Sequence, residues 1–159
     1  MITTVSLKDV LLDSTKEVFE TMVFMAVEES LQEEAGMGEQ ALLGTITFKG
    51  RLEGCLGICC AQACARAIAA SMLGIGSVEE LGDNDVGDAI GEIANMVLGA
   101  VKSRIQNDVG SIEVSIPSVV EGRELRNSLG EGSNRVRVRV SIEEEHMAEL
   151  SLLYREGGK

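Results

Sequence analysis

The chain has 159 residues, of which 45% are apolar and only 3% aromatic, and its formal net charge is −12. This length predicts one domain, residues 1–159, with an aliphatic core, and the acidic balance disfavours nucleic acid and anionic membrane surfaces as partners. No apolar run reaches the roughly 20 residues that cross a bilayer, and the N-terminus lacks a secretory signal pattern. We therefore expect a cytoplasmic protein.

The first half of the chain predicts a helix, a hairpin and a second helix. Between residues 6 and 30, apolar residues recur at helical steps: Val10, Leu11, Val18, Met22, Met25 and Ala26. After the polar segment 31–40, residues 41–60 alternate in two arms around a Lys-Gly-Arg turn, which indicates a β-hairpin. An alanine-rich helix follows from Ala61 to Leu73, and Gly74 is its expected C-terminal stop.

The middle of the chain predicts a connector at 74–85 and then a helix at 87–104. Asp83, Asn84 or Asp85 is expected to cap this helix at its N-terminus. Beyond it, Ile112, Val114 and Ile116 alternate with polar residues, which is typical of a strand with one solvent-facing side. Pro117 lies near the end of that strand, where a missing backbone donor is tolerated.

The C-terminal part predicts a polar loop at 121–134 and a hairpin formed by 135–142 and 147–154. In its first arm, valines and an isoleucine alternate with Arg135, Arg137 and Arg139, so the two sets point to opposite faces. The order of elements predicts an α+β fold, a two-layer α/β sandwich with long helices packed on a mainly antiparallel sheet.

A faint internal repeat is visible in the sequence. The pattern Asp13-x3-Glu17-x2-Glu20 parallels Asp88-x3-Glu92-x2-Asn95, and each copy lies in a helix that precedes a strand pair. Chance and an old duplication both explain the similarity, and a duplication would give the fold an internal pseudo-twofold axis.

Four cysteines lie within ten residues, at Cys55, Cys59, Cys60 and Cys64. Their spacing matches neither a zinc knuckle nor a thioredoxin-type pair. Free cysteines are commonly small buried apolar side chains, and we interpret these four in that way.

The helix at 87–104 has two contrasting faces. On a wheel of about 100° per residue, Val86, Ile90, Ile93, Val97 and Val101 fall in one arc, which is the expected buried stripe. The opposite arc holds Asp88, Glu92, Asn95, Gly99 and Lys102, with Gly87 and Gly91 on its flank. An outer-face glycine weakens a helix without serving the core, so we expect another molecule to approach this face closely.

The chemistry of the outer row favours positioning over covalent catalysis. No serine or cysteine stands beside a histidine, and Asp88 and Glu92 alone would share a cation only weakly. A carboxamide can hold a water molecule by donating and accepting hydrogen bonds, and a neighbouring carboxylate can bind a lysine or arginine of a partner. That combination suits a hydrolysis in which the partner supplies the electrophile and its metal.

The pattern Asp88-x3-Glu92-x2-Asn95, with Pro117 downstream, resembles the motif of the CheC/CheX/FliY phosphatases, which act on the phosphorylated chemotaxis regulator CheY. With one intact motif and this length, the chain is most similar to the CheX branch. In the first copy, Glu20 stands where the motif needs an amide, so we expect that half to be inactive.

The resemblance implies a CheC-like fold, a homodimer joined through strands, and an aspartyl phosphate on a response regulator as the substrate. Glu92 would pair with the regulator's active-site lysine, and Asn95 would orient the attacking water. Asp88 would support them, and Pro117 would shape the adjacent strand. The chain itself would bind no cofactor or metal, because Mg2+ would be held by the regulator. The remaining expected contact residues are Gly91, Gly99 and Lys102.

Two other functions stay open from the residues alone. The same face would also suit an adaptor that captures a phosphorylated receiver domain without hydrolysing it. The cysteine cluster leaves room for a metal or redox protein, although the ligand spacing is poor for that role.

Overall fold

The structure is a computed structural model and describes residues 4–30, 40–74, 81–122 and 133–157. Most of the loops expected at 31–40 and 121–134, and half of the loop expected at 74–85, lie outside these ranges. The helical elements are α1 (Thr4–Val18), the π-helical turn η1 (Phe19–Val23), α2 (Gln62–Leu73) and α3 (Asp83–Val109). The strands are β1 (Val27–Glu29), β2 (Ala41–Gly50), β3 (Leu52–Ala61), β4 (Ile112–Val114), β5 (Ser118–Gly122), β6 (Asn134–Ile142) and β7 (His146–Glu156).

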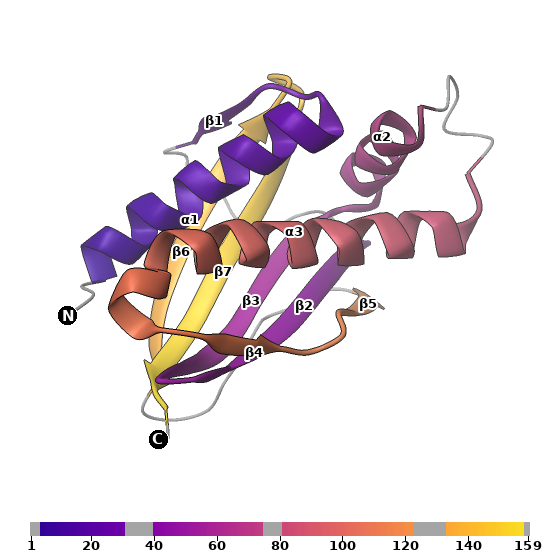
Figure 1. The fold of residues 1–159 in the computed structure, drawn as a ribbon. Coiled ribbons are helices and arrows are strands. Elements are labelled where there is room, and N and C mark those ends of the chain that lie inside the picture. The colour runs from indigo at the N-terminus through magenta and orange to yellow at the C-terminus, as the bar shows by residue number, and fades with distance from the viewer. Residues whose placement is uncertain (1–3, 31–39, 75–80, 123–132, 158–159) are drawn as a thin grey trace.

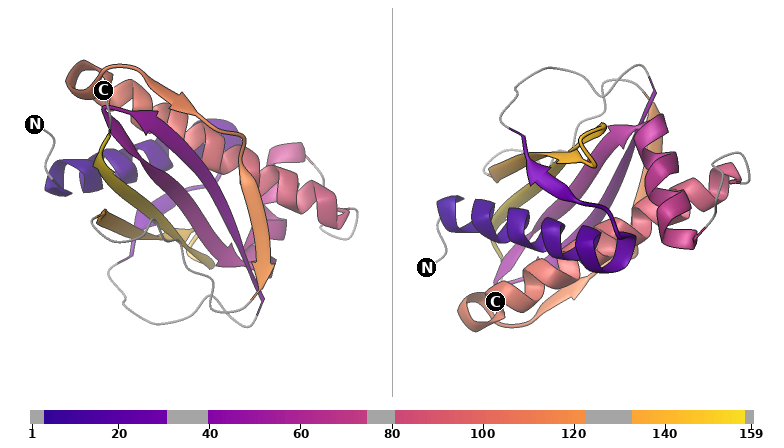
Figure 2. Two further views of the ribbon diagram at one scale, coloured as in Figure 1. Left: turned by 90° about the horizontal axis from the view of Figure 1, so that it is seen from below. Right: turned by 90° about the horizontal axis from the view of Figure 1, so that it is seen from above.

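All described strands join one sheet in the order β1-β6-β7-β3-β2-β4, and β5 also pairs with β2. Every one of these pairings is antiparallel. The helices α1 and α3 lie side by side across one face, and α2 packs against α3 near one end (Figures 1 and 2). The expected two-layer α+β sandwich is therefore confirmed.

The core lies between the helices and the sheet. Along β6, Val136, Val138 and Val140 are buried, whereas Arg135 and Arg137 are exposed, as the alternation predicts. The stripe of α3 that faces the sheet is buried as well: Val86, Ile90, Ile93, Val97 and Val101. Burial of each such aliphatic side chain contributes about 1.5–3 kcal/mol, so this stripe fixes the rotation of α3 about its own axis.

Helix α3 packs closely on β2 at Gly44. A Cβ atom at this position would lie 2.9 Å from Cγ2 of Ile90 and 3.3 Å from its carbonyl oxygen. Real Cβ atoms do not come this close to a stiff, buried neighbour, so a residue without a side chain is required here. Gly44 thus sets how near the helix can lie to the sheet.

The end of the first helix differs from the expectation of one helix over residues 6–30. The chain leaves the α-helix at Phe19 through a π-turn, and Phe24 then adopts a left-handed conformation with φ of 64°. Met22 is consequently 52% exposed rather than buried. The chain continues as β1, a strand that sequence analysis missed because Val27–Glu29 has no alternating apolar pattern.

The other two helices form where the sequence predicts them, α2 with nearly the expected bounds and α3 extended at both ends. Helix α2 ends as predicted at Gly74, whose φ is 69°. Helix α3 is longer than expected, and Gly82, not an acidic or amide residue, occupies its N-cap position. Asp85 still contributes, because its carboxylate accepts a hydrogen bond of 3.0 Å from the backbone N–H of Gly82.

The sheet order supports an internal pseudo-twofold repeat. Each half consists of a helix, an edge strand and a hairpin: α1, β1 and β2–β3 in the first, and α3, β4 with β5 and β6–β7 in the second. Exchanging the two halves reverses the strand order β1-β6-β7-β3-β2-β4 and otherwise leaves it unchanged. This is the arrangement that a duplicated unit produces.

The substitution Gly44→Ala should lower the free energy of unfolding by about 1–3 kcal/mol, because the added methyl group forces α3 and β2 apart. The control is Gly87→Ala on α3, where an added Cβ meets nothing within 4 Å and the free energy should rise by about 0.5–1 kcal/mol. Urea unfolding of both variants measures the effect. Equal stabilities would contradict the close approach at Gly44.

Candidate functional site

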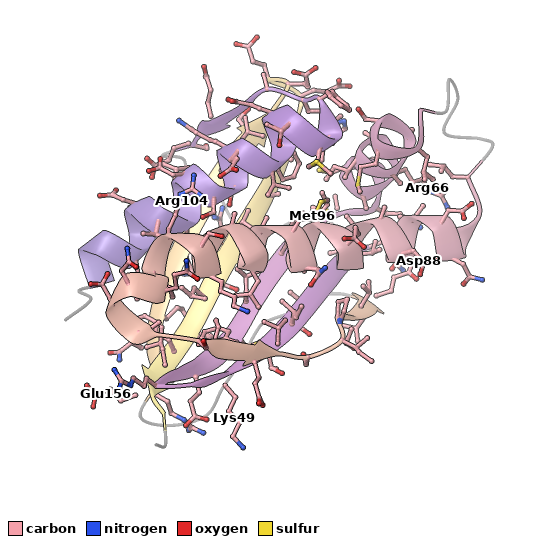
Figure 3. The ribbon with its side chains drawn as sticks, viewed as in Figure 1. Lys49, Arg66, Asp88, Met96, Arg104 and Glu156 are labelled. Carbon is pink, nitrogen blue, oxygen red and sulfur yellow. The ribbon has the colours of Figure 1, made fainter. Side chains whose placement is uncertain are left out.

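The residues on the arc of α3 opposite the buried stripe, here called the outer row, face solvent because that stripe is fixed against the sheet. Asp88, Glu92, Asn95 and Gly99 are exposed, and Lys102 is half-buried. Figure 3 shows Asp88 toward the N-terminal end of α3 and Arg104 toward the other end, beside α1. The row runs along the helix at steps of three and four residues, so its side chains stand above one another.

Glu92 and Asn95 form the polar pair at the middle of this row. The Nδ2 atom of Asn95 lies 3.5 Å from Oε1 of Glu92, at the long limit for a hydrogen bond. Such a contact orients the two groups toward each other but is weak. Both side chains therefore keep most of their hydrogen-bonding capacity for another molecule.

The strand predicted around Pro117 is interrupted by a β-bulge. Ser115 pairs with Thr47 through two hydrogen bonds of 2.9 Å, and Ser118 lies opposite Thr45. Between these pairs, Ile116 and Pro117 together face the single residue Ile46 of β2. Pro117 fits there because it has no backbone N–H that would need a partner.

The bulge changes the expected environment of Ile116. Sequence alternation predicted that Ile112, Val114 and Ile116 share a buried face. Ile112 is indeed buried, but Val114, which precedes the bulge, is 39% exposed. Ile116 is 89% exposed instead, because the extra residue of the bulge breaks the two-residue period after Ser115.

Gly91 serves the packing of the chain itself and is not part of the open outer surface. It is buried, and a Cβ at this position would lie 3.5 Å from Val119 and 3.6 Å from the ring of Pro117. This corrects the expectation that Gly91 belongs to the face that a partner contacts. Gly87 and Gly99 differ from it, because an added Cβ at either position meets no atom within 4 Å.

Comparison with known proteins gives the family. The family model described as "Chemotaxis phosphatase CheX" matches residues 42–141, which is more than half of the chain. The chain belongs to the CheX family. A search of curated proteins returned no match.

Solved structures of CheX proteins share the fold. The CheX of Vibrio vulnificus superposes with a TM-score of 0.76 at 22% identity, covering 98% of this chain and 100% of its own. A CheX from Desulfovibrio desulfuricans gives a TM-score of 0.76 at 18% identity, with 94% and 99% covered. The CheX-CheY-BeF3-Mg+2 complex from Borrelia burgdorferi gives 0.72 at 17% identity, with 93% and 97% covered.

The first-half copy of the CheX-like motif lies in a different environment. Its Glu17 forms an ion pair with Arg104 of α3, with Oε1 and Nη1 2.7 Å apart. Its Glu20 lies in the π-turn η1, beyond the end of the α-helix that carries Asp13 and Glu17. The carboxylate that corresponds to Glu92 is thus already paired within the chain.

The four cysteines are free thiols, and the described residues contain no group of three or more His, Cys, Asp or Glu side chains arranged for a metal. Cys55, Cys60 and Cys64 are buried and Cys59 is half-buried. A hydrogen bond with Cys64, together with burial, raises the pKa of the Cys60 thiol. Burial and the nearby Glu149 carboxylate raise the pKa of Cys59. Such thiols suit packing better than nucleophilic chemistry.

None of the helices that the structure describes is both long and apolar enough to span a membrane.

Two substitutions at Gly91 test its place in the packing. Gly91→Ala should keep or raise the free energy of unfolding by up to about 1 kcal/mol, since a Cβ makes ordinary contacts there and alanine favours the helix. Gly91→Leu should lower it by about 1–3 kcal/mol, because its outer carbons displace Pro117 and Val119. Urea unfolding measures both variants. An unchanged free energy of unfolding for Gly91→Leu would show that Pro117 and Val119 do not pack tightly at this position.

The raised pKa values predict slow alkylation of the native thiols at neutral pH. Iodoacetamide should modify Cys59 first, because Cys60 and Cys64 are buried, and the rate should climb as the pH approaches and passes the raised pKa. Glu149→Gln should speed the reaction at Cys59 by removing the negative charge that disfavours its thiolate. Peptide mass spectrometry over a pH series follows each site. Rapid modification of Cys60 at pH 7 would contradict this picture.

Proposed function

We propose that this chain hydrolyses the aspartyl phosphate of a phosphorylated CheY-type response regulator and so ends a chemotaxis or other two-component signal. The observation that carries the proposal is the exposed Glu92–Asn95 pair on α3, in a chain of the family described as chemotaxis phosphatases. The CheX-CheY complex from Borrelia burgdorferi supports a regulator of the CheY class as the partner.

In this proposal, Asn95 enters the phosphorylation site of the regulator and holds one water molecule in line with the phosphorus–oxygen bond. The carboxamide accepts a hydrogen bond from the water and leaves a water lone pair directed at phosphorus. The water oxygen bonds to phosphorus, the bond to the regulator's aspartate breaks, and inorganic phosphate and a free carboxylate result. This chain needs no nucleophile of its own, because positioning accounts for most of the catalysis in such transfers.

Glu92 pairs with a lysine of the regulator in the same proposal. A carboxylate near a phosphoryl group is unfavourable unless a cation neutralises it, and a chain of net charge −12 makes this requirement stricter. The regulator supplies the lysine for Glu92 and also holds the Mg2+, so this chain binds no cofactor. Asp88, Gly99 and Lys102 form the rim that the regulator covers, with Asp88 in a supporting role.

The proposal includes a homodimer, as the family resemblance implies, and the cytoplasm as its compartment. Its alternative is an adaptor that binds the phosphorylated receiver domain without hydrolysis. The two differ in one quantity, the lifetime of the regulator's phosphoryl group in the presence of this protein. The phosphatase shortens that lifetime, and the adaptor leaves it unchanged or lengthens it.

The decisive variant is Asn95→Ala. It should lower the rate of accelerated dephosphorylation by about 100-fold, the order of magnitude lost with one preorganised polar group, while binding to the regulator persists. The control is Asn107→Ala, the same change at another exposed position of α3, which should retain full activity. Loss of labelled phosphate from purified phosphorylated regulator gives the rates. Full activity of the Asn95 variant would show that the amide does not position the water.

A further inference from the structure

Met96 lies directly beside the Glu92–Asn95 pair on α3. It follows Asn95 in the chain and comes four residues, about one helical turn, after Glu92. Residues four apart on a helix have Cβ atoms about 5–6 Å from each other, so Met96 and Glu92 are neighbours whichever rotamers they adopt. Long side chains on a helix also lean toward its N-terminus, and for Met96 this is the direction of Glu92.

The side chain of Met96 lies between the core and the surface. It is half-buried, and its buried part packs against the hydrophobic core. Figure 3 shows Met96 on the side of α3 that is turned toward α1 and α2. The next turn of α3 offers it no cover, because Gly99 and Ala100 stand three and four residues later. The exposed part of Met96 is therefore open to another molecule.

The outer row of α3 is too small to form a protein interface by itself. A stable interface covers about 800 Å2 on each partner and involves roughly 20–30 residues of each. The row has five residues: Asp88, Glu92, Asn95, Gly99 and Lys102. A receiver domain that takes Asn95 into its phosphorylation site must therefore cover residues beside the row as well. Met96 is adjacent to both members of the polar pair, and methionine is a residue type enriched in protein interfaces.

We propose that Met96 is a docking contact for the receiver domain of the response regulator, seated against an apolar patch at the mouth of its phosphorylation site. This inference rests on the proposed function and adds to it a residue that determines affinity. The carboxylates of the row bind only where the partner offers cations, and that attraction weakens with salt. An apolar contact supplies affinity that salt does not screen. The flexible thioether chain of methionine also adapts to the shape of the surface it meets.

The test compares Met96→Ala with Met147→Ala, a matched change at another half-buried methionine. Leu150 of β7 pairs with Ile58, which in turn pairs with Gly44, the residue that faces α3. Met147 is three residues from Leu150 along the same strand, so it points to the opposite face of the sheet. Neither substitution changes the charge. A third variant, Met96→Leu, keeps the apolar character and most of the volume of the side chain.

Binding is measured by titrating each variant into a fluorescently labelled CheY-type regulator activated with beryllofluoride and Mg2+. Met96→Ala should raise the dissociation constant by about 5-fold, the factor expected when the partner no longer buries the exposed half of a methionine side chain. The ratio to wild type should persist at about 0.5 M salt. In steady-state dephosphorylation the loss should appear mainly in KM. Met96→Leu and Met147→Ala should both stay within about twofold of wild type.

A second measurement uses the wild-type chain and so does not depend on the folding of a variant. Hydrogen peroxide oxidises accessible methionine thioethers to sulfoxides, and peptide mass spectrometry gives the rate at each methionine. The activated regulator should slow the oxidation of Met96 and leave the rate at Met147 unchanged.

Three results would overturn the docking role, and they separate it from the proposed function. If the wild type accelerates dephosphorylation normally, unchanged binding by Met96→Ala or unprotected Met96 in the complex removes the docking role alone. Equal losses of binding for Met96→Ala and Met147→Ala assign the effect to a weakened fold. A wild type that neither binds the regulator nor shortens its phosphoryl lifetime removes the proposed function and the docking role together.

Discussion

The packing of α3 on β2 is the constraint on which the rest of the structure depends. Gly44 lets Ile90 sit against the sheet, and the buried stripe that continues from Ile90 to Val101 sets the rotation of the helix. Because a helix has 3.6 residues per turn, fixing one face also fixes the opposite one. The exposure of Glu92 and Asn95 is therefore a direct consequence of hydrophobic burial on the far side of the same helix.

A second contact holds the flank of α3. Gly91 and Pro117 meet where the edge strand bulges, so β4 and β5 are locked to the helix as well as to β2. This explains one of the three glycines in the helix, since any larger side chain than alanine at residue 91 would push the strand away. Gly87 and Gly99 have open space around them, so at these two positions no side chain projects from the outer surface of the helix. The polar row thus stands on a rigid base, which is what positioning catalysis requires.

Much of this arrangement could be predicted from the sequence, and the failures have physical causes. The buried stripe of α3 and the alternation in β6 follow from the spacing of apolar residues, which can be read within each element alone. The bulge at Ile116 could not be predicted, because it depends on which residues of β2 pair with Ser115 and Ser118. The π-turn that exposes Met22 also depends on tertiary contacts, among them the hydrogen bond from the Ser71 hydroxyl to the carbonyl oxygen of Val23. The role proposed for Asn95 came from a family motif, since periodicity identifies an exposed amide but not its chemistry.

The central claim is that the Asn95 side chain enters the phosphorylation site of a response regulator. The most direct measurement is the NMR signal of its side-chain amide group during titration with a CheY-type regulator. The account predicts that this signal shifts when the regulator carries beryllofluoride and Mg2+, shifts far less with the inactive regulator, and that the Asn107 amide signal stays in place in both titrations. An Asn95 signal that does not move while the activated regulator binds elsewhere on the chain would contradict the account.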